Sequence, residues 1–362
     1  MKILLFGEYS GLFNSLKAGL IALGHDVFMA SNGDYYRNFP SDYRWDSKLK
    51  IAKNEKINNI IGIINFFSNK KLFIGYDVVL IISPYQFSQY SLPNRLIYNY
   101  LINNNKKVFL SGAGITANLF DYWYERKEEK YYKYMVGYLE KSKDPKDCRY
   151  YKNKSMLNWE KELFNKIDGY IPIWYEYAQP FREVPNISKS VCIPINLNDF
   201  EYKPNIVKDK IVFFHGLSRP NKGGEYIIGA FDKLREKYKN EAEFICKGNL
   251  PIDEYLNLLD RTNVVLDDAN SYSLGMNALF SMAKGKIVMG GAEPIANKEL
   301  NYSYNPAYNL FPNIDQISDC IEDVIKRKAE IENMGLLSRK FVEEHHDCIE
   351  VARKYIQIWE NN

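Results

Sequence analysis

The sequence predicts two α/β domains, each built on a doubly wound parallel sheet, and three observations carry this prediction. The length of 362 residues suits two domains better than one. In both halves of the chain, short and continuously apolar segments alternate with helical patterns, and continuous apolar runs are typical of strands covered on both faces. A polar, irregular stretch from Asn196 to Asp209 separates the two rounds of this alternation, as expected of an interdomain connection.

The first domain, residues 1–203, opens with a β-α-β pattern. An apolar segment at Lys2–Gly7 is followed by a helical stripe of leucines and by a second apolar segment at Val27–Ser31. This order implies a parallel sheet with a right-handed crossover. Four further strands are expected in this domain, at Val78–Ile82, Lys107–Leu110, Tyr170–Ile173 and Val191–Ile193.

Two parts of the first domain do not have a strand pattern. Residues 121–161 combine many aromatic side chains with lysines and glutamates, which predicts a helical insertion that covers its own small core. An acceptor-binding or membrane-facing surface is the alternative. An earlier helical stripe is flanked by lysines, and we expect it to pack on the sheet. Its members are Ile57, Ile60, Ile61, Ile64 and Phe67.

The second domain, residues 204–345, repeats the alternation of strands and helices, so the chain is predicted to contain two Rossmann-like domains with a deep cleft between them. Residues 314–362 indicate two or three amphipathic helices, and residues 346–362 are expected to return to the first domain as a last helix. The expected strands are Ile211–His215, Glu243–Lys247, Asn263–Asp267, Lys286–Gly290 and Asn309–Phe311, with a helix over Glu225–Lys239.

Composition and charge exclude several classes of protein. Lysine plus arginine (48) against aspartate plus glutamate (45) leaves a net charge of +3, which is too balanced for affinity that rests on a nucleic-acid backbone. The five cysteines are dispersed and lack a C-x-x-C pair, which favours free thiols in a reducing compartment. We find no signal-peptide core and no apolar run near the roughly 20 residues of a membrane span. A cytoplasmic protein is expected, with peripheral contact to the cytoplasmic membrane left open.

The segment that follows the first strand of the second domain is the strongest candidate for a ligand site. A strand that leads into a glycine turn and a helix presents backbone N–H groups and a partial positive charge, so the pattern predicts an anion site for phosphates. Two cations within the turn add full charges. A plain capping turn with solvated cations is the alternative. The segment comprises His215, Gly216, Leu217, Ser218, Arg219, Pro220, Asn221, Lys222, Gly223 and Gly224.

A second segment of the same kind begins at Val264, where a strand leads through Asp267, Asp268 and a serine-rich turn into Gly275 and a helix. The carboxyl ends of parallel strands meet at one edge of a sheet. Both turns should therefore face one crevice.

The order and spacing of these segments resemble glycosyltransferase family 4 over most of the chain. The similar motifs are the start of the chain through Val27, Ile193–Asn196, Lys222-Gly223 and Ser281–Val288. The resemblance implies the two-domain GT-B fold and transfer of a sugar from a nucleotide-diphosphate donor to a glycan or lipid-linked acceptor. It also implies retained anomeric configuration and a role in bacterial surface polysaccharide (capsule) assembly.

The turns and the resemblance together define the expected site. Arg219 and Lys222 are the expected catalytic groups, because they stabilise the departing diphosphate. Donor contacts are expected from His215, Gly216, Arg219, Lys222, Gly223, Asp268, Ser271, Tyr272, Ser273, Gly275, Met276 and Asn277. Acceptor or cleft contacts are expected in the first domain, where a tight turn for helix packing is the equal alternative. These residues are Gly7, Glu8, Tyr9, Ser10, Gly11, Asn14, Gly112 and Gly114.

The sequence departs from the family's pattern at the sugar end. Tyr272 and Phe280 stand where the family carries the two glutamates of its E-x7-E motif, and Leu217 stands where it carries an arginine. No D-x-D motif occurs, so we expect helix dipoles and the two cations to act without a metal or other cofactor. A nucleotide-sugar 2-epimerase and a non-catalytic GT-B module that binds a nucleotide or glycan are the alternatives.

Overall fold

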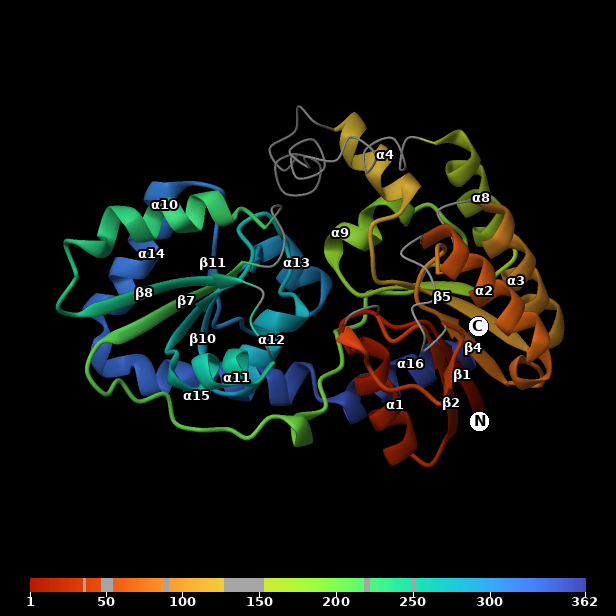
Figure 1. Ribbon diagram of the computed structural model, residues 1–362, viewed down its shortest axis with the longest axis horizontal. Coiled ribbons are helices and arrows are strands. Elements are labelled where there is room, and N and C mark those ends of the chain that lie inside the picture. Colours follow the sequence, from red (N-terminus) through yellow and green to blue (C-terminus); the bar gives the residue numbers. More distant parts are fainter. Residues whose placement is uncertain are drawn as a thin grey trace. The chain divides into compact units, whose positions relative to one another are not determined.

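The computed structural model describes residues 1–34, 37–46, 55–86, 91–126, 153–217, 222–248, 250 and 252–362. The chain divides into two compact units. The first comprises Met1–Tyr122, Lys146–Asn196 and Cys348–Asn362, and the second comprises Trp123–Pro145 and Leu197–Asp347. Each unit carries its own parallel sheet (Figure 1), which confirms the predicted fold class of two doubly wound α/β domains.

The first unit has a six-stranded sheet in the order β3-β2-β1-β4-β5-β6, and all pairs in it are parallel. The strand order reverses between β1 and β4, the kind of position at which doubly wound sheets bind ligands. The central strands are fully buried, as continuous apolar runs predict. The strands are β1 (Lys2–Phe6), β2 (Asp26–Ser31), β3 (Tyr43–Arg44), β4 (Val78–Ile81), β5 (Lys107–Gly112) and β6 (Gly169–Pro172).

The helices of the first unit include the last helix of the chain, α16, which packs against α1. Gly19 permits this contact, because a Cβ there would lie 2.0 Å from the carbonyl oxygen of Cys348. Figure 1 shows both chain termini on this unit. Its helices are α1 (Leu12–Ala22), α2 (Glu55–Ser68), α3 (Ser91–Asn104), α4 (Ala117–Glu125), α8 (Lys154–Phe164), α9 (Tyr175–Ala178) and α16 (Cys348–Asn361), with short 3-10 helices η2 (Lys70–Phe73) and η3 (Gln179–Phe181).

The helical insertion expected at 121–161 falls largely on residues 127–152, which lie outside the described residues. Helices α4 and α8 stand at its two ends. Among the described residues, no helix combines the length and the apolar character needed to cross a bilayer.

The second unit has a five-stranded parallel sheet in the order β11-β10-β9-β7-β8, which reverses between β7 and β9. Helices α10 and α14 pack together over a core that includes Phe213, Phe231 and Ile321. The strands are β7 (Ile211–Leu217), β8 (Ala242–Gly248), β9 (Val264–Leu266), β10 (Ile287–Gly290) and β11 (Tyr308–Asn309). The helices are α10 (Gly224–Arg235), α11 (Ile252–Arg261), α12 (Met276–Ala283), α13 (Pro294–Glu299), α14 (Ile314–Lys326) and α15 (Ile331–His345), with 3-10 helices η4 (Leu197–Asp199) and η5 (Lys328–Glu330).

The strand expected at Val191–Ile193 is wrong. The segment is buried, and the N–H of Val191 donates to the carbonyl of Pro172 at 2.9 Å, but no regular ladder forms. Pro194 follows directly and has no N–H with which to continue such a ladder. The segment therefore runs beside β6 as irregular chain.

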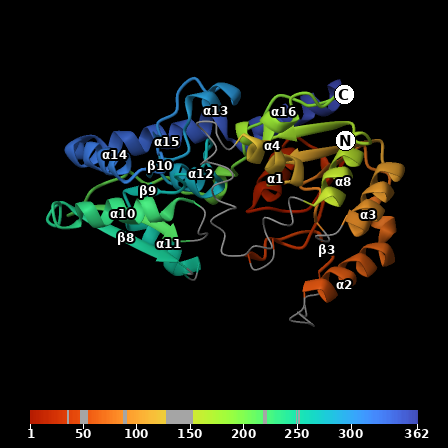
Figure 2. The same ribbon diagram turned by 90° about the horizontal axis from the view of Figure 1, so that it is seen from above.

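The expectation that the α2 stripe packs on the sheet is also wrong. Ile57, Ile60, Ile64 and Phe67 are 45%, 56%, 58% and 36% exposed. The helix instead turns Phe66 inward. Because α2 is apolar on both sides, its pattern alone could not decide which side faces the sheet. Seen from above in Figure 2, α2 and α3 again lie beside each other, as in Figure 1.

Candidate functional site

The turn after β7 brings Lys222 and Gly223 to the start of α10. Gly223 has a φ of 69°, in the left-handed region that favours glycine, and α10 begins at Gly224. As the N-cap residue, Gly223 offers no side chain to the first N–H groups of the helix. Arg219 lies outside the described residues, and so does the rest of the turn from 218 to 221.

His215 lies near the end of β7 and is buried. Its Nδ1–H donates to the carbonyl of Leu266 at 2.8 Å, which leaves Nε2 as an acceptor. That nitrogen lies beside the start of α10, since a Cβ on Gly224 would lie 3.0 Å from it. Burial lowers the pKa of His215. The imidazole is therefore neutral at pH 7 and adds no charge to the site.

Asp267, at the end of β9, joins the two turns and was not among the expected site residues. Its Oδ1 lies 2.6 Å from Nζ of Lys222 and accepts a bond from Nδ2 of Asn277 at 3.1 Å. Burial opposes ionisation of Asp267, but the bonds from Lys222 and Asn277 outweigh it and hold its pKa below the ordinary value. Lys222 is thus held in place by an ion pair rather than extended alone.

Backbone contacts also join the two turns. The N–H of Ala269 donates to the carbonyl of Lys222 at 2.9 Å. A Cβ on Gly223 would lie 3.0 Å from Cβ of Ala269, so a side chain at that position would push the turns apart. Asp268 turns back to accept from the N–H of Asn270 at 2.8 Å. The two loops therefore form one surface at the carboxyl edge of β7 and β9, where the strand order reverses.

The segment from Ser271 to Asn277 leads into α12. Ser271 and Ser273 are buried, and the hydroxyl of Ser271 donates to the carbonyl of Ser273 and accepts from its N–H. Gly275 is the N-cap residue of α12 and makes no side-chain bond. Tyr272 is fully buried. Gly216, Met276 and Asn277 are half-buried.

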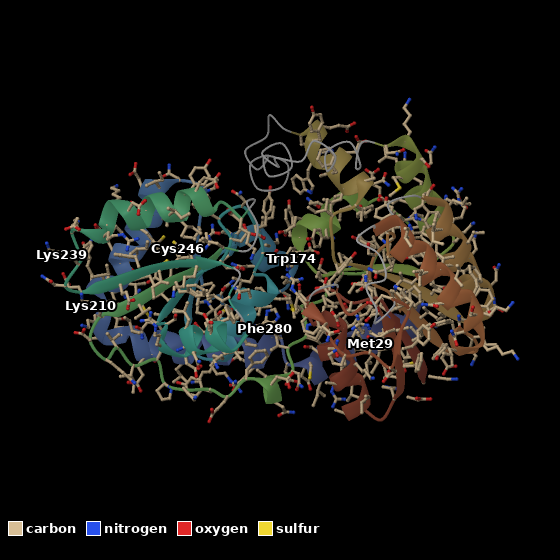
Figure 3. The ribbon with its side chains drawn as sticks, viewed as in Figure 1. Met29, Trp174, Lys210, Lys239, Cys246 and Phe280 are labelled. Carbon is tan, nitrogen blue, oxygen red and sulfur yellow. The ribbon has the colours of Figure 1, made fainter. Side chains whose placement is uncertain are left out.

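Phe280 is packed as well. Its ring, labelled in Figure 3, lies in the second unit. The ring stacks on that of Phe200 with centroids 4.7 Å apart. Together with the burial of Tyr272, this fills with aromatic packing the two positions at which the resemblance implied glutamates.

Glu293 is a second residue that the sequence interpretation missed. It follows β10, the neighbour of β9, and its N–H donates to the carbonyl of Tyr272 at 3.0 Å. Glu293 is only 4% exposed, and its Oε1 has no hydrogen-bond partner among the described residues. A buried carboxylate oxygen without a donor is costly to the fold. The signal was an acid three residues after the end of β10, beyond Gly291 and Ala292.

The corresponding turn of the first unit is occupied by its own carboxylate. Glu8 is fully buried, and its oxygens accept from the N–H groups of Gly11 (3.0 Å) and Asn14 (3.0 Å) and from Nδ2 of Asn14 (2.6 Å). Burial raises the pKa of Glu8 to about 7, against the opposing effect of these donors. The predicted residues Glu8, Gly11 and Asn14 thus meet, but as the cap of α1.

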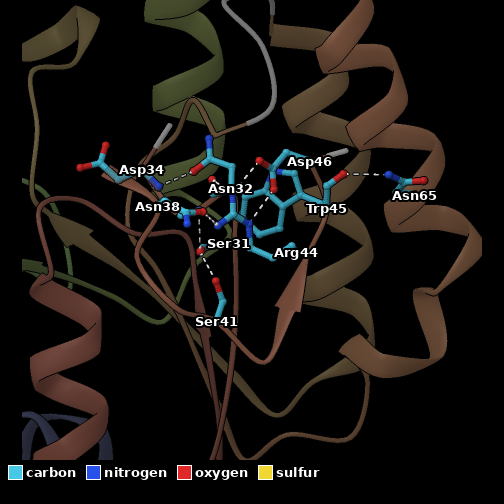
Figure 4. A network of polar contacts seen from close by, with 10 residues as sticks. Ser31, Asn32, Asp34, Asn38, Ser41, Arg44, Trp45, Asp46 and Asn65 are labelled. Carbon is cyan, nitrogen blue, oxygen red and sulfur yellow. Dashed lines mark hydrogen bonds and ion pairs between the residues drawn. The ribbon is translucent and has the colours of Figure 1, made fainter. Parts of the chain in front are cut away.

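The turn is fixed by close packing on either side. Gly7 has a φ of 104°, and a Cβ there would lie 2.2 Å from Cγ2 of Ile82. The N–H of Ser10 donates to Oδ2 of Asp34 at 2.8 Å. Asp34 belongs to the loop after β2, whose polar network around Arg44 appears in Figure 4.

The residues expected after β5 divide into two groups. Gly114 lies near Tyr9, since its Cβ would stand 3.4 Å from that ring, so these two predicted residues come together. Gly112 instead packs under Tyr170, where a Cβ would lie 2.3 Å from the hydroxyl.

A second buried carboxylate caps the helix after β5. Glu160 of α8 accepts from the N–H groups of Ala117 (2.6 Å) and Asn118 (2.8 Å) at the start of α4. Burial raises its pKa. Among the described residues, we find no group of three acidic, histidine or cysteine side chains that would hold a metal ion.

Comparison with known proteins agrees with this architecture. No family model and no curated protein sequence matches the chain. The structure is similar to sucrose-phosphate synthase from Thermosynechococcus elongatus, with a TM-score of 0.65 and 13% identity over 100% of this chain and 99% of that chain. It is similar to HepE of Anabaena in complex with UDP and glucose, with a TM-score of 0.61 and 11% identity over 100% of both chains.

A third similar structure is the UDP-GlcNAc 2-epimerase from Neisseria meningitidis bound to UDP-GlcNAc, with a TM-score of 0.51 and 12% identity over 100% of both chains. Identities this low show the fold alone. The chain has the two-domain GT-B fold, and its structural neighbours include GT-B glycosyltransferases.

Proposed function

We propose that the chain is a glycosyltransferase that moves a sugar from a nucleotide-diphosphate donor to a glycan or lipid-linked acceptor. The observation that carries this proposal is a difference between the helix starts of the two units. Helices α1 and α4 begin over the buried carboxylates of Glu8 and Glu160. Helices α10 and α12 follow the N-cap residues Gly223 and Gly275, which make no side-chain hydrogen bond to the helix. Helix N-termini attract anions, so the edge of the second sheet suits a diphosphate.

Lys222 supplies the charge that the departing diphosphate needs. Its ion pair with Asp267 fixes the ammonium beside the start of α10. Preorganised charge of this kind stabilises a leaving group as its negative charge develops. Arg219 is proposed as the second cation of the turn. Transfer without a metal and with retained configuration is part of the proposal.

Glu293 is proposed to accept a hydroxyl of the donor sugar. Tyr272 is fully buried and Phe280 is stacked on Phe200, so neither offers a polar group to the sugar. Oε1 of Glu293, which has no partner among the described residues, belongs to the N-cap residue of α13, in the loop after β10. On the first unit, the acceptor is proposed to contact Tyr9 and Gly114.

The comparisons support the choice of donor class. HepE was solved with UDP and glucose, and the name of sucrose-phosphate synthase describes the joining of sugars. We propose a cytoplasmic enzyme of bacterial surface polysaccharide synthesis. Four cysteines of the described residues (Cys192, Cys246, Cys320 and Cys348) are free thiols, which fits a reducing compartment.

Calorimetry with UDP tests the donor site through Lys222. Lys222→Ala alone would leave Asp267 as an uncompensated buried charge and risks unfolding the unit. The double variant Lys222→Ala/Asp267→Asn removes both charges, and we expect it to fold and to bind UDP roughly 10- to 100-fold more weakly.

Lys210→Ala is the matched control. Lys210 directly precedes β7, and its Nζ donates to the carbonyl of Lys239. Both residues lie at the end of the sheet opposite to Lys222 (Figure 3), so the loss of Lys210 should leave UDP affinity unchanged. Wild-type UDP affinity in the double variant would remove Lys222 from the site. Incubation with a panel of UDP-sugars then distinguishes transfer from epimerisation. Formation of an epimer without an acceptor would indicate an epimerase, and a 2-epimerase is among the similar structures.

A further inference from the structure

More than half of the large hydrophobic side chains that are exposed in the described residues lie in one stretch of the first unit. We call them the α2–α3 face. Single exposed hydrophobic residues are common on protein surfaces, but a cluster of them marks an interaction site. The face consists of Ile57, Ile60, Ile64, Phe67, Leu72, Ile74, Leu92 and Leu96.

The two helices form one continuous face. On α2, Ile57, Ile60, Ile64 and Phe67 follow the spacing of one helix side. On α3, Leu92 and Leu96 continue at intervals of four residues to Tyr100. The ring of Tyr100 packs edge-on against Phe67 with centroids 6.3 Å apart, and its hydroxyl donates to the carbonyl of Lys70 at 3.2 Å. The exposed leucines therefore lie in the row of side chains that meets α2.

Contacts on the inner side of α2 hold the apolar side outward. Nδ2 of Asn65 donates to the carbonyl of Trp45 at 2.9 Å, as Figure 4 shows, and the hydroxyl of Tyr43 donates to the carbonyl of Asn65 at 3.0 Å. The ring of Phe66 stacks on Phe73 at 4.5 Å. The orientation of the helix is thus set by specific inward contacts, which leave Ile57, Ile60 and Ile64 exposed.

Between Glu55, the first residue of α2, and Asp77, the charged side chains of this part of the chain are basic. Neither residues 57–76 nor residues 91–107 contain an aspartate or glutamate. Arg95 and Lys106 pair with acids from other segments, at 2.6 Å each. Lys70 and Lys71, at the end of the isoleucine stripe, are exposed. An apolar stripe that ends in lysines and lacks acids is complementary to a surface that is apolar inside and negatively charged outside.

We propose that the α2–α3 face docks on an anionic lipid bilayer. Helix α2 has 14 residues, too few to cross a membrane, so it lies in the interface with its isoleucines among the acyl chains and Lys70 and Lys71 at the headgroups. The partner is a lipid surface, and the binding needs neither donor nor acceptor sugar. The inference therefore does not depend on the proposed transfer reaction.

Sedimentation with vesicles tests the docking. The full chain is mixed with phosphatidylcholine vesicles, with or without about 30% phosphatidylglycerol. We expect binding to the anionic vesicles, little binding to the neutral ones, and loss of binding as salt is raised. Ile60→Asp/Ile64→Asp should weaken the partition at least about tenfold, since it places charges in the interface. Lys70→Glu/Lys71→Glu should weaken it about tenfold on anionic vesicles.

Matched variants in the second unit serve as controls. Ile206→Asp/Leu256→Asp changes two residues that are 61% and 41% exposed, and Lys239→Glu/Lys326→Glu makes the same change in net charge. Both should bind vesicles as the wild type does. Because all the substituted residues are exposed, thermal unfolding should stay unchanged in every variant.

Three results would overturn the docking proposal. They are absence of wild-type binding to anionic vesicles, equal loss in the face and control variants, and a wild-type dimer that Ile60→Asp/Ile64→Asp converts to a monomer while vesicle binding is unaffected. The last result would make the face a subunit interface. UDP affinity is measured on the same samples. If the wild type does not bind UDP, this result would count against the proposed transfer reaction but not against the docking proposal.

Discussion

Glu8 lies under the first turn of α1, where burial raises its pKa from 4.5 to about 7. Between these values the folded chain holds the proton of Glu8 more tightly than the unfolded chain. The contribution of Glu8 to the free energy of unfolding therefore falls as the pH rises through this window, by up to roughly 3 kcal/mol. Glu8→Gln cannot ionise, so the stability of the wild type relative to this variant should fall between pH 5 and pH 8.

Urea unfolding at both pH values measures this difference. Glu160 titrates in both proteins, so its own raised pKa cancels in the comparison. Glu241→Gln changes an exposed carboxylate and should leave the pH dependence of the wild type intact. Parallel stability curves for the wild type and Glu8→Gln would show that Glu8 ionises normally.

Glu293 offers a second prediction at this scale. The unpartnered oxygen of Glu293 destabilises the fold, so Glu293→Gln should leave the stability of the protein equal or higher. The same oxygen is proposed to bind the donor sugar, so this substitution should reduce the affinity for the matching UDP-sugar about tenfold, with a smaller effect on the affinity for UDP. Calorimetry and thermal unfolding of one preparation measure both. Equal losses for UDP and UDP-sugar would place Glu293 away from the sugar.

The sequence interpretation included Lys222 among the candidate site residues but not Asp267, its ion-pair partner. Lys222 stands in a glycine turn between a strand and a helix, a pattern with a known physical use. Asp267 is 45 residues away, and its contact with Lys222 depends on β7 and β9 being neighbours. Strand order is a property of the folded sheet, so no local sequence pattern predicts the ion pair between Lys222 and Asp267.

At the scale of elements, Gly223 connects a helix start to a neighbouring loop. Gly223→Ala adds the cost of a left-handed backbone and a Cβ 3.0 Å from Ala269. We expect a loss of about 2 kcal/mol in the stability of the second unit and weaker UDP binding. Denaturant unfolding and calorimetry measure the two effects.

Gly24→Ala is the matched control for this change. Gly24 has a φ of 81° and nothing within 4 Å of the added Cβ, so it reports the backbone cost alone. Equal destabilisation by the two substitutions would mean that the contact with the Ala269 loop contributes nothing.

The helices and strands themselves were largely predictable, because continuous apolar runs and amphipathic stripes are local signals. The predictions of helices and strands that were wrong also have local causes. The two-residue strand β3 (Tyr43–Arg44) has no apolar run, and Val191–Ile193 has the run without the ladder. On α2 the helical pattern was correct and its direction was not, because Gly62 and Phe66 face inward while Ile57, Ile60 and Ile64 are exposed.

At the scale of the whole molecule, the first unit depends on a helix from the far end of the chain. Gly19→Ala would place a Cβ 2.0 Å from a backbone oxygen of Cys348, which must separate α1 from α16. We expect a loss of about 3 kcal/mol in the stability of the first unit, despite the better helix propensity of alanine. Thermal unfolding measures it.

Gly229→Ala is the comparison. Its Cβ would meet the tip of the Ile314 side chain at 2.7 Å, and a flexible tip can move aside, so this change should cost much less. If both variants unfold at the same temperature as the wild type, the contact between α1 and α16 is not closely packed in solution.

The path of the chain also sets the order in which a ribosome can complete the protein. Synthesis leaves the first unit after Asn196, supplies Leu197–Asp347 for the second, and only then delivers Cys348–Asn362. The second unit can therefore close during translation, while α1 waits uncovered for α16. The unit begun first is finished last. A message truncated by its final fifteen codons would still encode the sheet of the second unit, but on a chain whose first unit lacks α16.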